Sequence, residues 1–163
     1  YVKNELMEKR DFKSEILSSD KLIKTYNLYE EHKDQINKID FDDMLIKTYH
    51  LLQNNKPALD MIRNVYKYIL VDEFQDINKV QFEVLKLIAN HRDNIFVVGD
   101  EDQSIYGFRG SRPDVLLEFQ QYFEDTKKVL LDINYRSKNE IINVANRLIE
   151  KNENRYEKMN YKR

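Results

Sequence analysis

Residues 68–76 read Tyr68-Ile69-Leu70-Val71-Asp72-Glu73-Phe74-Gln75-Asp76, a short apolar run that ends in acidic and amide side chains. A continuous apolar run of this length predicts a buried strand. A second run, Ile95-Phe96-Val97-Val98, ends in the same way at Gly99-Asp100. Between the two runs, apolar residues recur at helical spacing over residues 80–88. Short strands that alternate with helices predict βαβ units and a parallel sheet, and therefore an α/β fold.

The regions on either side of this unit are predicted to be mainly helical. Apolar residues recur at helical spacing over 22–39, after a start signal at Ser18-Ser19-Asp20, and again over 41–52. Further along the chain, the pattern predicts a short helix at 58–65, a helix at 113–122 and a third strand at 129–131. Ser137-Lys138-Asn139-Glu140 predicts a capping box that opens a helix with three apolar residues on one face: Ile141, Ala145 and Leu148.

The composition excludes several classes of site. The 163 residues include no cysteine, so disulfides and thiolate metal sites are excluded, and three scattered histidines make a zinc site an unpromising hypothesis. No stretch approaches the ~20 consecutive apolar residues that span a bilayer, and the first residues lack a secretory pattern. We therefore expect a cytoplasmic protein with no membrane partner. The net charge of −2 does not by itself indicate a nucleic-acid partner. The chain does not begin with Met, as expected for part of a longer protein.

Acidic residues follow both predicted strands, at the edge where parallel sheets bind ligands. An aspartate such as Asp72 at a strand end can hold Mg²⁺ directly or through water. The neighbouring Glu73 can orient and deprotonate the water that attacks a γ-phosphate. The alternative is a solvated acidic turn without a ligand.

Residues 99–111, Gly-Asp-Glu-Asp-Gln-Ser-Ile-Tyr-Gly-Phe-Arg-Gly-Ser, combine polar groups after a strand with Tyr106, Phe108 and Arg109. Aromatic side chains beside an arginine are suited to stacking on unpaired bases and to contacting the nucleic-acid backbone. An extended chain from Gln103 to Arg109 spans roughly 20 Å at most. One loop could therefore link a phosphate site to a nucleic-acid groove. Alternatively, Tyr106 and Phe108 are core residues beneath a glycine-rich turn.

Four segments, taken in order, resemble the UvrD/PcrA/Rep-like superfamily 1 DNA helicases. Phe41-Asp42-Asp43-Met44-Leu45 resembles the FDDLL segment of that family, and residues 72–76 resemble motif II, DExQD. Residues 99–111 resemble motif III, and Asn134-Tyr135-Arg136-Ser137 resembles motif IV, NYRS. The resemblance covers about positions 38 to 155.

The resemblance implies a partial RecA-like parallel sheet with flanking helices, preceded by a segment of a helical subdomain. Residues 1–66 would end the insertion in the first RecA-like domain. Residues 67–127 would form the second half of that ATPase domain, and residues 128–163 would open the second RecA-like domain.

The resemblance also implies a role for each matching residue, with ATP and Mg²⁺ as cofactors. Asp72 would bind Mg²⁺, Glu73 would be the catalytic base, and Gln103 would sense the γ-phosphate and couple it to DNA. Asp100 would join the nucleotide-binding set, Tyr135 would stack on adenine, and Arg136 would clamp the γ-phosphate. The residues that would face single-stranded DNA, near a junction with duplex, are Tyr106, Phe108 and Arg109.

The sequence departs from the family pattern in several places. Phe108 stands where Trp is common, and Ser111 replaces the usual Ala. No G-x-x-x-x-G-K-[ST] phosphate-binding loop is present, so we expect an internal fragment that is inactive alone.

One alternative is an AddA/RecB-like helicase-nuclease, and another is a non-catalytic helicase remnant that serves as a binding module. A metal-dependent nuclease is the least favoured, and would use Asp72, Glu73, Asp76 and Asp100.

Overall fold

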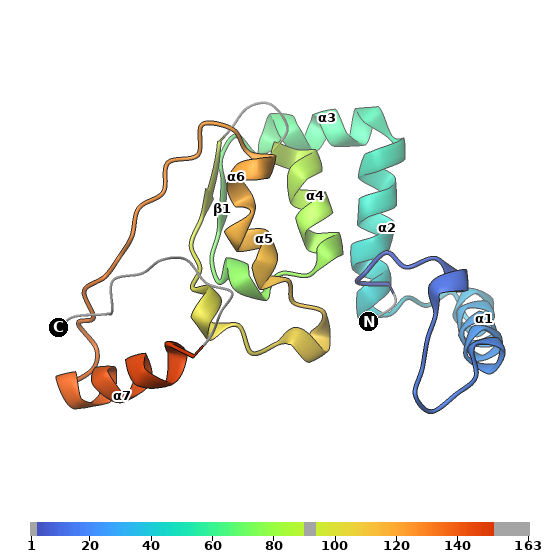
Figure 1. Cartoon of the computed structure of the whole chain (residues 1–163). Coiled ribbons are helices and arrows are strands. Elements are labelled where there is room, and N and C mark those ends of the chain that lie inside the picture. Colours follow the sequence, from blue (N-terminus) through green and yellow to red (C-terminus); the bar gives the residue numbers. More distant parts are fainter. Residues whose placement is uncertain (1–2, 90–93, 152–163) are drawn as a thin grey trace.

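A parallel pair of strands, joined by a helix, forms the α/β part of the chain (Figure 1). The computed structural model describes residues 3–89 and 94–151. Strand β1 (Ile69–Val71) pairs with β2 (Ile95–Val97) so that Ile69 lies opposite Ile95 and Val71 lies opposite Val97. Helix α4 (Lys79–Ala89) lies between them in the sequence. The predicted βαβ unit is confirmed, with strands slightly shorter than the apolar runs.

Helices make up most of the remaining structure, and most begin and end close to the predicted positions. In the N-terminal part they are α1 (Ser19–Gln35), α2 (Phe41–Asn54) and α3 (Lys56–Val65). After β2 they are α5 (Pro113–Leu117), α6 (Phe119–Tyr122) and α7 (Asn139–Ile149). Glu118 separates α5 from α6, where a single helix was predicted. Short 3-10 turns form η1 (Lys9–Asp11), η2 (Phe74–Asp76), η4 (Glu101–Gln103) and η5 (Gly107–Arg109).

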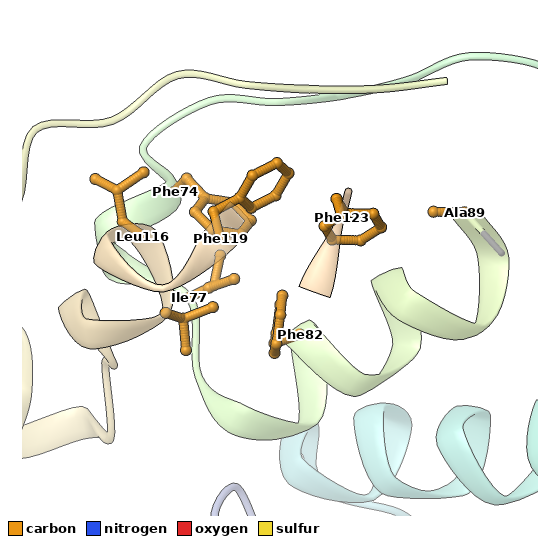
Figure 2. Packing of buried hydrophobic residues seen from close by; sticks show 8 residues of the cluster. Phe74, Ile77, Phe82, Ala89, Leu116, Phe119 and Phe123 are labelled. Atoms are coloured by element: carbon orange, nitrogen blue, oxygen red, sulfur yellow. The ribbon is translucent and has the colours of Figure 1, made fainter. Parts of the chain in front are cut away.

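The core lies between one face of the sheet and helices α4, α5 and α6 (Figure 2). Phe74 is completely buried and makes edge-on ring contacts with Phe82 and Phe119, with centroids 6.2 and 5.5 Å away. Truncating a buried Phe to Ala typically costs about 3–5 kcal/mol. Phe74 sits in the middle of the acidic segment, so the core itself fixes the position of that segment. The other buried members are Ile77, Ala89, Val115, Leu116 and Phe123.

The opposite face of the sheet is open in the part of the chain that the structure describes. Leu70 is 74% exposed and Phe96 is 62% exposed, whereas the alternate strand residues pack against the core. Side chains alternate between the two faces of a strand, so one covering layer buries only every second residue. The prediction of fully buried strands is therefore wrong for the described residues.

Helices α2 and α3 pack against α4 and attach the helical N-terminal part to the α/β part. The guanidinium of Arg63 on α3 donates two hydrogen bonds to the carbonyl of Leu87, near the end of α4, at 2.9 and 2.5 Å. Basic side chains near a helix C-terminus donate hydrogen bonds to its unpaired carbonyls and interact favourably with the negative end of the helix dipole. Among the helices that the structure describes, none is both long enough and apolar enough to cross a membrane.

Two predictions about the C-terminal part are wrong. Residues 129–131 form no strand, and Val129 and Leu131 are about three-quarters exposed, at 70% and 74%. A strand is stabilised by ladder hydrogen bonds from a neighbour, and no described strand pairs with this segment.

Helix α7 also differs from its prediction, because its N-cap is Lys138 and no side-chain capping bond forms there. The predicted capping box at Ser137 is therefore absent. Ile141 and Leu148 on the predicted apolar face are exposed, while Ile142 and Asn146 are buried.

A cluster of two lysines and three carboxylates joins the N-terminal segment to α1 and α2. Its members are Lys3, Glu30, Lys33, Asp40 and Asp43, and we refer to them as the lysine–carboxylate cluster. Both lysines bind the carboxylate of Asp43, and each also contacts Glu30, at 2.8 Å for Lys3 and 2.9 Å for Lys33. The three carboxylates lie close enough together to hold a cation, but the two ammonium groups already lie among them.

Asp40 and Asp43 also form a capping box at the start of α2. The Asp40 carboxylate accepts from the Asp43 amide at 2.7 Å, and the Asp43 carboxylate accepts from the Asp40 amide at 3.1 Å. Burial alone would raise the pKa of Asp43, but hydrogen bonds from Lys3 and Lys33 outweigh it and lower the pKa. Burial likewise opposes the charge of Lys33, but its carboxylate partners raise the pKa of its ammonium. Asp43 and Lys33 are therefore both charged near neutral pH.

Candidate functional site

The two acidic segments are held together at one edge of the sheet. The amide of Val98 donates to the carbonyl of Val71, and the amide of Phe74 donates to the carbonyl of Val98, both at 2.9 Å. These bonds extend the ladder beyond the paired strand residues. As predicted from the strand ends, residues 72–76 and 99–103 share the carboxyl edge.

Asp72 and Glu73 lie in a tight turn directly after β1. The carboxylate of Asp72 accepts a hydrogen bond from the amide of Glu73 at 2.9 Å. Glu73 has a left-handed backbone with φ 49° and ψ 43°. A residue with a side chain pays of order 1–3 kcal/mol for such a conformation, so the surrounding structure must hold it. The next residue, Phe74, is anchored in the core and supplies that hold, while both acidic side chains remain exposed.

Gln75 connects the two acidic segments. Its side chain is buried, its Nε2 donates to Glu73 Oε2 at 2.8 Å, and its Oε1 accepts from the amide of Asp100 at 3.0 Å. Its backbone carbonyl accepts from the Ser104 hydroxyl at 3.3 Å. Gln75 was not among the predicted site residues, although an amide two residues after a strand-end glutamate was a usable signal.

Asp76 adds a third carboxyl group to the segment after β1. Burial raises the pKa of Asp76, and the nearby negative charge of Glu73 raises it further. Its Oδ1 is buried and has no hydrogen-bond partner among the residues that the structure describes. Burial therefore opposes the charge of Asp76.

Asp100 and Gln103 lie together in the turn after β2. The carboxylate of Asp100 accepts from the amide of Asp102 at 3.2 Å and from Gln103 Nε2 at 2.7 Å. The side chain of Gln103 is exposed at the acidic edge. The structure therefore brings together four of the predicted site residues, Asp72, Glu73, Asp100 and Gln103.

The aromatic residues lie further along the same loop. The rings of Tyr106 and Phe108 are 6.1 Å apart, and Phe108 is 75% exposed. The alternative that Phe108 is a core residue is therefore wrong. The loop is closed at its base, where the Ser111 amide donates to the Tyr106 carbonyl at 3.3 Å and Gly110 adopts a positive φ of 82°. The side chain of Arg109 lies outside what the structure describes.

Tyr135 and Arg136 lie in a separate turn before α7. The side chain of Asn134 accepts from the amides of Arg136 and Ser137, both at 2.9 Å. Tyr135 is 89% exposed and Arg136 is also exposed. Within residues 3–89 and 94–151, no hydrogen bond or ion pair joins these two side chains to the acidic edge. The structure thus leaves this part of the predicted site apart from the rest.

The fold and the site together define an α/β protein with an acidic site at the carboxyl edge of a parallel sheet, the edge at which such sheets bind ligands. Comparison with known protein families shows which family the chain belongs to. Residues 1–124 match the UvrD/REP helicase N-terminal domain, and the chain belongs to this family.

Several bacterial proteins are similar to most of the chain. It is 39% identical to YjcD of Bacillus subtilis over 133 residues, which are 82% of this chain and 18% of YjcD. It is 38% identical to the ATP-dependent DNA helicase PcrA of Staphylococcus epidermidis over 156 residues, which are 94% of this chain and 21% of PcrA. PcrA of Staphylococcus aureus is 36% identical over the same length. The chain spans about a fifth of the length of these relatives.

Proposed function

We propose that this chain is an internal portion of an ATP-dependent DNA helicase that couples Mg-ATP hydrolysis to movement on single-stranded DNA and to duplex unwinding. Membership of the UvrD/REP family and the similarity to PcrA support this proposal. The relatives are about five times longer, and the 163 residues contain no G-x-x-x-x-G-K-[ST] loop. The phosphate-binding loop would then lie elsewhere in the full-length protein.

One observation carries the proposal: hydrogen bonds link the acidic edge to the aromatic loop without interruption. Glu73 is bound to Gln75, Gln75 to Ser104, and the hydroxyl of Ser104 lies 3.4 Å from that of Ser111 at the base of the loop. A motor must transmit the state of a nucleotide site to a DNA site. A short bonded chain of this kind gives a physical route for that transmission.

At the nucleotide site, Glu73 would act as the general base toward the attacking water. Asp72 fits a Mg²⁺ ligand, because it offers an exposed carboxylate at a strand end and Mg²⁺ prefers carboxylate and water oxygens. When bound, the ion would neutralise charge on the phosphate oxygens. Asp100 and Gln103, which are bound to each other, would complete the nucleotide-binding set.

The remaining roles extend beyond the acidic edge. We assign Tyr106, Phe108 and Arg109 to single-stranded DNA near a junction with duplex. We assign Tyr135 to the adenine and Arg136 to the γ-phosphate. In this scheme residues 1–66 end a helical insertion, residues 67–127 belong to the first RecA-like domain, and residues 128–163 open the second. Closure of the two domains would bring Tyr135 and Arg136 to the acidic edge.

The test is Glu73→Gln in the full-length protein that carries this segment. Loss of a general base typically lowers kcat ~10²–10⁴-fold, while Mg-ATP binding should be retained because the amide has the size of the carboxylate. The matched control is Glu31→Gln, at an exposed glutamate on α1. DNA-stimulated turnover within twofold of wild type in Glu73→Gln would contradict the proposal.

A further inference from the structure

We propose that Gln75 is a positioning residue that aims the Glu73 carboxylate and ties its orientation to the loop at residues 99–111. The inference rests on the proposed role of Glu73 as the general base. Gln75 itself need touch neither nucleotide nor DNA. It acts through the hydrogen bonds that its side chain and backbone make.

The orientation of the Gln75 amide follows from its neighbours. The backbone amide of Asp100 is a donor, so it requires the oxygen Oε1, which lies 3.0 Å away. The nitrogen Nε2 is then turned toward Glu73 Oε2, an acceptor 2.8 Å away. A flipped amide would place donor against donor and acceptor against acceptor. The network therefore allows a single orientation, and that orientation holds one oxygen of the Glu73 carboxylate.

Gln75 is held rigidly enough to act as a support. Its side chain is 1% exposed, and its neighbour Phe74 is fully buried. On the other side, Gly99 approaches so closely that a Cβ there would lie 2.8 Å from Gln75 Oε1 and 3.2 Å from the Gln75 amide nitrogen. Only glycine leaves room for this contact. Because the Gln75 side chain is buried, water cannot reach this position and take over the hydrogen bonds of its amide.

Glu73 depends on this support because its own side chain is exposed. An unrestrained glutamate samples many rotamers, and fixing them costs up to about 2 kcal/mol. A misplacement of about 1 Å in a catalytic group can cost on the order of 10²-fold in rate. Gln75 also binds the Asp100 amide and the Ser104 hydroxyl. A shift of the loop would therefore be transmitted to the carboxylate.

The primary experiment is Gln75→Met in the full-length protein. Methionine has a similar length and volume but cannot bind Glu73 or the Asp100 amide. We expect DNA-stimulated kcat to fall about 10- to 100-fold, with the Mg-ATP dissociation constant within twofold of wild type. Gln53→Met, at an exposed glutamine on α2, is the control and should leave both values unchanged. A kcat for Gln75→Met within twofold of wild type would overturn the proposal.

A double-mutant cycle separates positioning from general damage to the fold. If Gln75 acts through Glu73, Gln75→Met should change the residual single-turnover rate of Glu73→Gln by less than twofold. If Gln75→Met lowers the single-turnover rate by the same factor in the wild-type and Glu73→Gln backgrounds, Gln75 does not act through Glu73. The proposed function would still stand. Near-normal turnover by Glu73→Gln would instead overturn the proposed function. The two failures are therefore distinguishable.

Gly99→Ala gives a second approach if Gln75→Met does not fold. The added methyl displaces the Gln75 amide without changing its chemistry. We expect a kcat loss of the same order that again disappears in the Glu73→Gln background. A folded Gly99→Ala protein with wild-type kcat would count against the proposal.

Discussion

The amide of Phe74 donates to the carbonyl of Val98 at 2.9 Å, beyond the last paired residues of the two strands. Phe74 is fully buried, so this bond ties the turn after β1 to the core and to the turn after β2 at once. The two acidic turns therefore keep a fixed spacing. The proposed Mg-ATP site requires this rigidity.

The 163-residue chain alone should not hydrolyse ATP above background. It lacks the loop whose backbone amides and lysine would hold the phosphates. The measurement is phosphate release by the purified chain with Mg-ATP, with and without single-stranded DNA. DNA-stimulated turnover by this chain would contradict the prediction.

Phe108→Ala in the full-length protein should weaken binding to single-stranded DNA by roughly 1–3 kcal/mol, the value of one stacked base. The unfolding temperature should change little, because Phe108 is exposed. Phe82→Ala is the matched control: Phe82 is buried, and its loss should cost about 3–5 kcal/mol of stability. If Phe108→Ala destabilises the protein yet binds DNA normally, stacking is the wrong role.

Arg109→Ala should act differently, through counterion release. A phosphate contact on a single strand contributes about −0.7 to the slope of log K against log salt. The variant should reduce the slope by about that amount, whereas Phe108→Ala should leave it unchanged. Salt titrations of both variants check this, and an unchanged slope for Arg109→Ala would exclude a phosphate contact.

Arg136→Ala in the full-length protein should lower turnover far more than it lowers ADP affinity. The guanidinium is proposed to meet the γ-phosphate, which ADP lacks. Arg136→Lys should restore little activity, because an ammonium lacks the planar fork of the guanidinium. Turnover and ADP titrations check both statements, and full rescue by Lys would indicate a general electrostatic effect instead.

Asp43→Ala should destabilise the chain by about 1–3 kcal/mol, because it removes the most buried of the three carboxylates that Lys3 and Lys33 share. Glu30 and Asp40 remain as partners of both lysines. Glu31→Ala, at an exposed residue on α1, should change the stability by less than about 0.5 kcal/mol. Chemical denaturation of the two variants checks the difference. Equal stabilities would show that the lysine–carboxylate cluster adds nothing.

The same cluster should set the acid limit of stability. The pKa values of Asp40 and Asp43 are lowered in the folded chain, so their contribution is present above about pH 4 and is lost as the pH falls through the folded values. The pKa values of Lys3 and Lys33 are raised, so their contribution persists up to about pH 10 and is lost above it. We expect a plateau in the free energy of unfolding between these limits. Below pH 4, the free energy of unfolding of Asp43→Ala should fall less steeply with decreasing pH than that of the wild type.

The sequence by itself determined the βαβ unit, the helix positions and the two acidic strand ends. These features follow from local information, because burial on one side imposes a period of about 3.6 on a helix and ends an apolar run at the sheet edge. The motifs at 72–76, 99–111 and 134–137 likewise pointed to the family that the comparison shows.

Only the tertiary structure decided which groups meet across the chain. Gln75 and Asp100 are 25 positions apart, and Lys3 and Asp43 are 40 apart, so no local pattern joins them. The tertiary structure also decided that residues 129–131 form no strand, that one sheet face stays open, and that Phe108 is exposed. The reason is the same in each case. A strand, a buried face or a positioned carboxylate depends on what lies opposite in space, and propensity along the chain does not contain that information.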